Sequence, residues 1–91
     1  MINLNASITS YSDWEHHWDF KQYVLQSPKL SKAEIAMFNN AWEVAIDSKL
    51  WCFNDIVLGC KSASNALRLS FPGLSDMATA SIVRAISYEW K

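Results

Sequence analysis

Chain-breaking residues are scarce, and this scarcity constrains the fold more than any other feature of the sequence. The 91 residues include two glycines and two prolines, and β-hairpin turn pairs such as Asn-Gly are absent. Tight turns between strands depend on such residues, whereas helices need few of them. The chain is therefore expected to be all-α, with its few breakers separating helices.

Helix-start signals are frequent along the same chain. Ser12 and Ser31 are each followed by a glutamate at the third position, which is the pattern of a capping box. Asn54 and Ser75 are each followed directly by an aspartate. Such pairs are typical N-caps, with an acid in the first turn where the helix dipole favours it.

The spacing of apolar residues agrees with these helix starts. Counting 100° per residue after each start gathers apolar side chains on one face of the expected helix. The expected fold is a single domain over residues 1–91, a compact bundle of about four helices with a short N-terminal arm. The extended arm covers residues 1–11, and the helices cover about 13–26, 32–48, 55–69 and 76–89.

The composition is that of a folded protein expected in the cytoplasm. Hydrophobic residues make up 51% of the chain and aromatic residues 13%, which is enough to build a core. The N-terminus has no signal-peptide pattern, and no apolar run is long enough to span a membrane. Cys52 and Cys60 are expected to be reduced thiols. The aromatic residues expected in the core are Trp42, Trp51, Phe53, Phe71 and Trp90.

The first expected helix, residues 13–26, carries the main candidate site. On a helical wheel its polar strip is narrow, and its apolar arc is about twice the roughly 100° that one core normally covers. Either this helix is wedged among the other three, or part of the arc contacts another protein. Trp14 and Trp18 are the expected exposed anchors, because tryptophan is common at binding hot spots. The expected protein interface consists of Trp14, His17, Trp18, Phe20, Lys21 and Tyr23.

The histidines of this segment also suggest a metal site or an acid–base site. Asp13 and His17 stand four residues apart, with His16 beside them. Zinc needs further ligands, and the spacing of the cysteines does not supply them. No nucleophile elbow, phosphate loop or cofactor fingerprint occurs in the sequence. We therefore expect no enzyme activity, no metal and no cofactor, and we interpret these residues as the edge of a packed or interfacial helix.

The segment IVLGCKSASNALRL, residues 56–69, provides an alternative. It resembles the turn and recognition helix of helix-turn-helix DNA-binding proteins, which implies a DNA-binding regulator. The periodicity, however, runs one helix through Gly59, and the net charge of −1 lacks the basic excess typical of DNA binders. A solvated polar face is therefore favoured. The residues that would face nucleic acid or an acidic protein are Lys61, Ser64, Asn65 and Arg68.

The function that the sequence favours is non-catalytic protein binding. A small inhibitor or adaptor would dock on a larger protein, or on a second copy of itself, through residues 13–26. Small size and a lack of catalytic motifs are common among such proteins, including those that phages and other mobile elements direct against host machinery. Neither nucleic acid nor a membrane is the expected partner.

Overall fold

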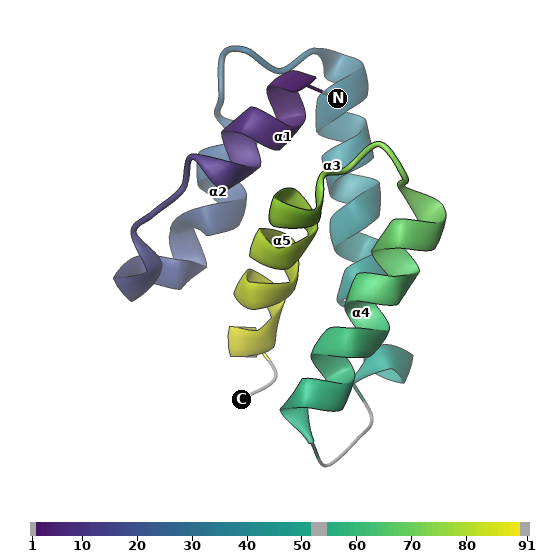
Figure 1. Cartoon of the computed structure of the whole chain (residues 1–91). Coiled ribbons are helices and arrows are strands. Elements are labelled where there is room, and N and C mark those ends of the chain that lie inside the picture. The colour runs from purple at the N-terminus through teal and green to yellow at the C-terminus, as the bar shows by residue number, and fades with distance from the viewer. Residues whose placement is uncertain (1, 52–54, 90–91) are drawn as a thin grey trace.

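A computed structural model describes residues 2–51 and 55–89, and all regular structure in these ranges is helical (Figure 1). This confirms the all-α class. None of the described helices is long and apolar enough to cross a membrane. The α-helices are α1 (Ile2–Thr9), α2 (Phe20–Leu25), α3 (Lys32–Ala45), α4 (Ile56–Ser70) and α5 (Asp76–Glu89), and two 3-10 helices, η1 (Trp14–Asp19) and η2 (Ser48–Leu50), precede α2 and follow α3.

The N-terminal segment is the main departure from the expected fold. Residues 2–9 form helix α1 rather than an extended arm, so the described chain has five α-helices instead of about four. Leu4 and Ile8 lie one turn apart and are fully buried, because α1 packs against α5 and also contacts α2 and α3. Helices this short are marginal in isolation, so α1 is stabilised by this packing rather than by local signals.

Helix α5 forms the centre of the fold. It packs against α4, α1, α3 and η1, and Figure 1 shows it between α1 and α4. Burial on several sides is unusual for a surface helix, which normally buries a single stripe. Six of its 14 residues are buried: Ala78, Thr79, Ile82, Val83, Ala85 and Ile86.

Hydrogen bonds join α1 to both proline-containing connectors. The Asn5 side chain donates to the Gly73 carbonyl at 3.1 Å and accepts from the Ser75 amide at 3.0 Å. The hydroxyls of Ser7 and Ser27 are hydrogen-bonded at 3.0 Å. These bonds fix α1 against the α4–α5 connector and the α2–α3 connector.

Side-chain caps start the three longest helices, at the predicted serines of α3 and α5 and, for α4, at Asp55 of the predicted Asn54-Asp55 pair. Ser31 and Glu34 form the capping box of α3. The carboxylate of Asp55 accepts from a backbone amide in the first turn of α4, and the Ser75 hydroxyl does the same for α5. Each of these bonds satisfies an amide that the helix itself leaves unpaired.

The expected helix over residues 13–26 is divided into two elements. Its first part is the 3-10 helix η1, in which His16 has non-helical angles (φ −113°, ψ 54°), and the α-helix begins only at Phe20. The capping box predicted at Ser12 is not formed. The N-cap of η1 is Asp13, whose carboxylate makes no cap hydrogen bond and instead pairs with His16 Nδ1 at 2.9 Å. The prediction of a wide apolar arc on this helix is therefore wrong, because residues 14–19 do not follow the rotation of 100° per residue of an α-helix.

The large aromatic side chains are mostly in the core, as expected. Trp42 and Trp51 are buried, and Phe71 is partly buried against the core. Cys60 is a half-buried free thiol, and burial raises its pKa. Four further residues for which the sequence makes a prediction lie outside the described residues: the thiol Cys52, the expected core residues Phe53 and Trp90, and the expected cap residue Asn54.

Candidate functional site

Trp14 and Phe20 belong to the aromatic core rather than to an exposed interface. Phe20 is fully buried, and its ring stacks on Trp14 with the centroids 5.4 Å apart. The Arg84 guanidinium of α5 lies 4.4 Å from the centroid of the Trp14 ring. Trp14 is therefore half-buried between an aromatic ring and a cation, and the expectation of an exposed Trp14 anchor and a Phe20 contact is wrong.

His17 and Lys21 also contact rings of the same chain. The His17 imidazole stacks on Tyr88 of α5, with centroids 4.1 Å apart and planes inclined by 11°. Lys21 Nζ lies 5.3 Å from the centroid of the Trp42 ring of α3. Both side chains are half-buried, so they attach η1 and α2 to the rest of the bundle.

Trp18 and Tyr23 are the predicted interface residues that remain exposed. Trp18 is 61% exposed and Tyr23 is 44% exposed. The Trp18 indole meets the rings of His16 and His17 edge-on, at centroid distances of 5.3 and 5.0 Å. These contacts orient the indole while leaving most of its surface in solvent.

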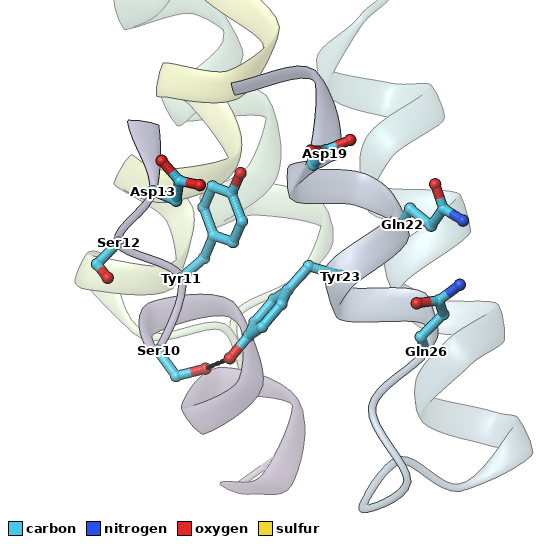
Figure 2. A pocket seen from close by; sticks show the side chains of 8 residues that line it. All are labelled: Ser10, Tyr11, Ser12, Asp13, Asp19, Gln22, Tyr23 and Gln26. Atoms are coloured by element: carbon cyan, nitrogen blue, oxygen red, sulfur yellow. Dashed lines mark hydrogen bonds between the residues drawn. The ribbon is translucent and has the colours of Figure 1, made fainter. Parts of the chain in front are cut away.

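A hollow of 490 Å³ opens beside Tyr23 (Figure 2). Its volume falls within the range of about 300–1,000 Å³ that is typical of small-ligand sites. The connector after α1 forms one wall, and the end of η1 together with α2 forms the other. The lining residues are Ser10, Tyr11, Ser12, Asp13, Asp19, Gln22, Tyr23 and Gln26.

Two tyrosine rings give the hollow a fixed aromatic wall. The rings of Tyr11 and Tyr23 are 5.1 Å apart and tilted by 59°. The Tyr23 hydroxyl and Ser10 Oγ are hydrogen-bonded at 2.8 Å, as Figure 2 shows. Tyr11 is buried, and its hydroxyl donates to the carbonyl oxygen of His16. Because both hydroxyls are held, the wall is formed before any ligand binds.

The charged side chains that line the hollow are both acidic. Figure 2 shows the carboxylates of Asp13 and Asp19 at the same end of the hollow as the Tyr11 hydroxyl. Burial raises the pKa of Tyr11, and the charges of Asp13 and Asp19 raise it further. The negative charges of both carboxylates therefore act on the same end of the hollow, at the Tyr11 hydroxyl. Asp13 pairs with His16, whereas Asp19 has no ion-pair partner among the described residues.

The sequence did not identify the connector half of this hollow. The sequence predicts Ser10 and Tyr11 in an extended arm and Ser12 at a helix cap, and neither prediction brings them beside α2. The clue available in the sequence was the tyrosine itself, because a large aromatic residue in a short segment usually packs against something.

The polar residues predicted to share a face in residues 56–69 lie together on α4, where they line a second, smaller hollow of 360 Å³. Val57 and Cys60 also line this second hollow. Arg68 Nε lies 3.8 Å from a carboxylate oxygen of Asp76. The predicted residues that share this face are Lys61, Ser64, Asn65 and Arg68.

Gly59 is an interior residue of α4, so the turn of a helix-turn-helix is not present in residues 56–69. Its role is close packing. A Cβ atom at this position would lie 2.4 Å from Cε3 of Trp51. The glycine therefore lets the indole reach the helix backbone, and the resemblance to a DNA-binding turn is wrong at this position.

Asp13, His16 and His17 do not converge on one point. Asp13 binds His16, whereas His17 stacks on Tyr88 of α5. In the part of the chain that the structure describes, no group of three or more His, Cys, Asp and Glu side chains is placed to hold a metal ion.

We use the name acidic face for the eight residues that line the hollow together with Trp18. Trp18 directly precedes Asp19, which belongs to the lining. No protein-family model, curated protein or solved structure matches the chain.

Proposed function

We propose that this protein is a non-catalytic binding protein that docks on another protein through the acidic face. The observation that carries the proposal is the exposure of Trp18 and of Tyr23, whose side chain lines a preformed hollow of 490 Å³. Tryptophan and tyrosine are enriched at binding hot spots, and a preformed surface loses little conformational entropy on binding. The role is that of an inhibitor or adaptor in the cytoplasm, of the kind that phages and other mobile elements also encode.

Charge indicates which kind of partner surface fits. The charged residues of this face, Asp13 and Asp19, are both exposed. The nearby cations Lys21 and Arg84 lie over Trp42 and Trp14 of the same chain. The partner is therefore expected to present a basic patch, since complementary potentials favour the correct encounter.

Site-specific photo-crosslinking in the cells that encode the protein tests this proposal. A photoreactive phenylalanine replaces Trp18 or Tyr23, and in matched controls it replaces Leu69 or Met77, which are 86% and 72% exposed on α4 and α5. We expect a discrete adduct with one other protein from the first pair and none from the controls. Equal adducts at every position, or no adduct at Trp18 and Tyr23, would contradict the proposal. An adduct between two copies of the chain would replace the separate partner by a homodimer.

We propose binding of nucleic acid by α4 as the alternative function. Its support is the shared hollow that Lys61 and Arg68 line with Ser64 and Asn65. We place it second, because neutralisation of phosphates dominates such affinity and this face offers few cations. A mobility shift with random duplex DNA at low salt measures it. A shift that the double variant Lys61→Glu and Arg68→Glu abolishes would support this function, and a shift that it leaves unchanged would exclude α4.

A further inference from the structure

We propose that the hollow of the acidic face is a socket for an arginine side chain of the partner protein. This inference rests on the proposed function and adds the chemistry that the face recognises. The guanidinium would lie against the rings of Tyr11 and Tyr23 and pair with the carboxylates of Asp13 and Asp19.

The sign of the charge in the hollow is the first argument. Its lining contains two carboxylates and no lysine or arginine. Anions such as phosphate would be repelled, and a neutral group would gain no ion pair with Asp19, which has no ion-pair partner among the described residues. A cation is the ligand that this lining favours.

The aromatic wall distinguishes an organic cation from a metal ion. A calcium ion takes about six to eight oxygen ligands, and a hollow with two carboxylates does not provide a dedicated cage. Tyrosine faces, in contrast, attract guanidinium and ammonium groups through the ring quadrupole. The exposed side-chain amides of Gln22 and Gln26 add oxygens that accept hydrogen bonds along the open side.

The chain already binds cations on aromatic rings in this region. Arg84 lies 4.4 Å from the centroid of Trp14, and Lys21 lies 5.3 Å from that of Trp42. Neither Arg84 nor Lys21 lines the hollow, so these two cations do not occupy it. Of these two contacts, the one that Arg84 makes is the shorter. In general, the planar guanidinium of arginine stacks on aromatic rings and pairs with carboxylates through two parallel hydrogen bonds. For this reason we assign the socket to arginine.

A titration of the full-length, nitrogen-15-labelled protein with blocked tripeptides tests the socket. The probes are acetyl-Gly-Arg-Gly-amide, the same peptide with citrulline, which keeps the shape and removes the charge, and the same peptide with lysine. We expect amide shifts confined to residues 10–13 and 19–26, with a dissociation constant on the order of 1 mM for the arginine peptide. The citrulline peptide should bind at least about fivefold more weakly.

Variants locate the binding groups. Asp19→Asn should weaken binding of the arginine peptide by about fivefold, and Tyr23→Leu should weaken it while Tyr23→Phe does not. Glu43→Gln is the matched control, because it removes an exposed charge on α3, outside the lining. Asp19 makes no cap hydrogen bond, so its variant should keep the wild-type circular dichroism. If a variant fails to fold, the comparison of arginine and citrulline on the wild-type protein still decides.

Equal binding of arginine and citrulline, shifts spread over all acidic residues, or no shift at the highest soluble peptide concentration would overturn the socket. Equal binding of lysine would overturn the assignment to arginine. Failure of the titration together with a partner crosslinked at Trp18 would leave the proposed docking function intact. Binding of the arginine peptide without any crosslinked protein would contradict the docking function instead.

Discussion

At the scale of single residues, the sequence does not predict the close packing of Trp51 on Gly59. The Trp51 indole is buried, and its Nε1–H donates to the Ala45 carbonyl at 2.7 Å. This bond fixes the ring against α4, so the ring cannot move away from an added methyl group without losing the bond. The absence of a side chain at Gly59 is therefore a packing requirement.

We predict that Gly59→Ala destabilises the protein. Alanine favours a helix over glycine by about 1 kcal/mol, but the new Cβ would lie 2.4 Å from Cε3 of Trp51. Overpacking of a well-packed site costs about 1–3 kcal/mol, so the free energy of unfolding should fall by about 1 kcal/mol, measured by urea denaturation. In a Trp51→Leu background the same change should be neutral or stabilising. A more stable Gly59→Ala variant of the wild-type chain would show that Trp51 does not pack there.

At the scale of elements, α1 is a part of the core. We predict that Ile8→Ala lowers the free energy of unfolding by about 2–4 kcal/mol, because Ile8 is fully buried. Urea denaturation measures the change. Thr9→Ala is the control on the exposed side of α1 and should change stability by less than about 0.5 kcal/mol. A loss of that small size for Ile8→Ala would indicate a detached N-terminal arm.

Glu34 joins two elements, and this makes α1 sensitive to pH. Its carboxylate accepts the backbone amide of Leu4 at 2.8 Å and also caps α3 at Ser31. Partial burial acts to raise the pKa of Glu34, but the hydrogen bonds from the amides of Ser31 and Leu4 prevail and lower it from 4.5. A lowered pKa in the folded state means that the ionised carboxylate stabilises the fold above its ordinary pKa, and that this stabilisation is lost as the pH falls through the folded pKa.

We predict that Glu34→Gln lowers stability at neutral pH and flattens the dependence of stability on pH. The free energies of unfolding of wild type and variant should converge between about pH 5 and pH 3. Urea denaturation across this range measures the effect. Glu43→Gln, on the exposed side of α3, should leave the wild-type slope unchanged. Parallel curves for Glu34→Gln and wild type would contradict the role given to these hydrogen bonds.

The sequence predicts an element well where local signals and packing agree. Helices α3, α4 and α5 have side-chain caps and a regular apolar face, and their starts were predicted within a residue or so. Helix α1 has eight residues and no charged side chain in its terminal turns, so it has little local signature. The non-helical backbone angles of His16 lie within η1, which contacts α5, and no periodicity in the sequence reports them.

At the scale of the whole molecule, the aromatic residues of the N-terminal third divide into two sets. Trp14 and Phe20 pack with the core, whereas Trp18 and Tyr23 stay exposed, and Tyr23 lines the acidic hollow. Helical periodicity places all of them on one arc and cannot say which neighbours cover which ring. The interface that the sequence predicts over residues 13–26 stays a prediction, and only the tertiary structure separates the buried aromatic residues from the exposed ones.

In the proposed function, Trp18 is exposed for binding and not for folding. The most direct test of this role compares Trp18→Ala with wild type in affinity for the crosslinked partner and in free energy of unfolding, with Leu69→Ala as the matched exposed control. We predict that Trp18→Ala loses at least about 2 kcal/mol of binding free energy, or about 30-fold in affinity. Its stability to urea should stay within about 0.5 kcal/mol of wild type. An unchanged affinity, or a loss of affinity accompanied by an equal loss of folding stability, would contradict the claim.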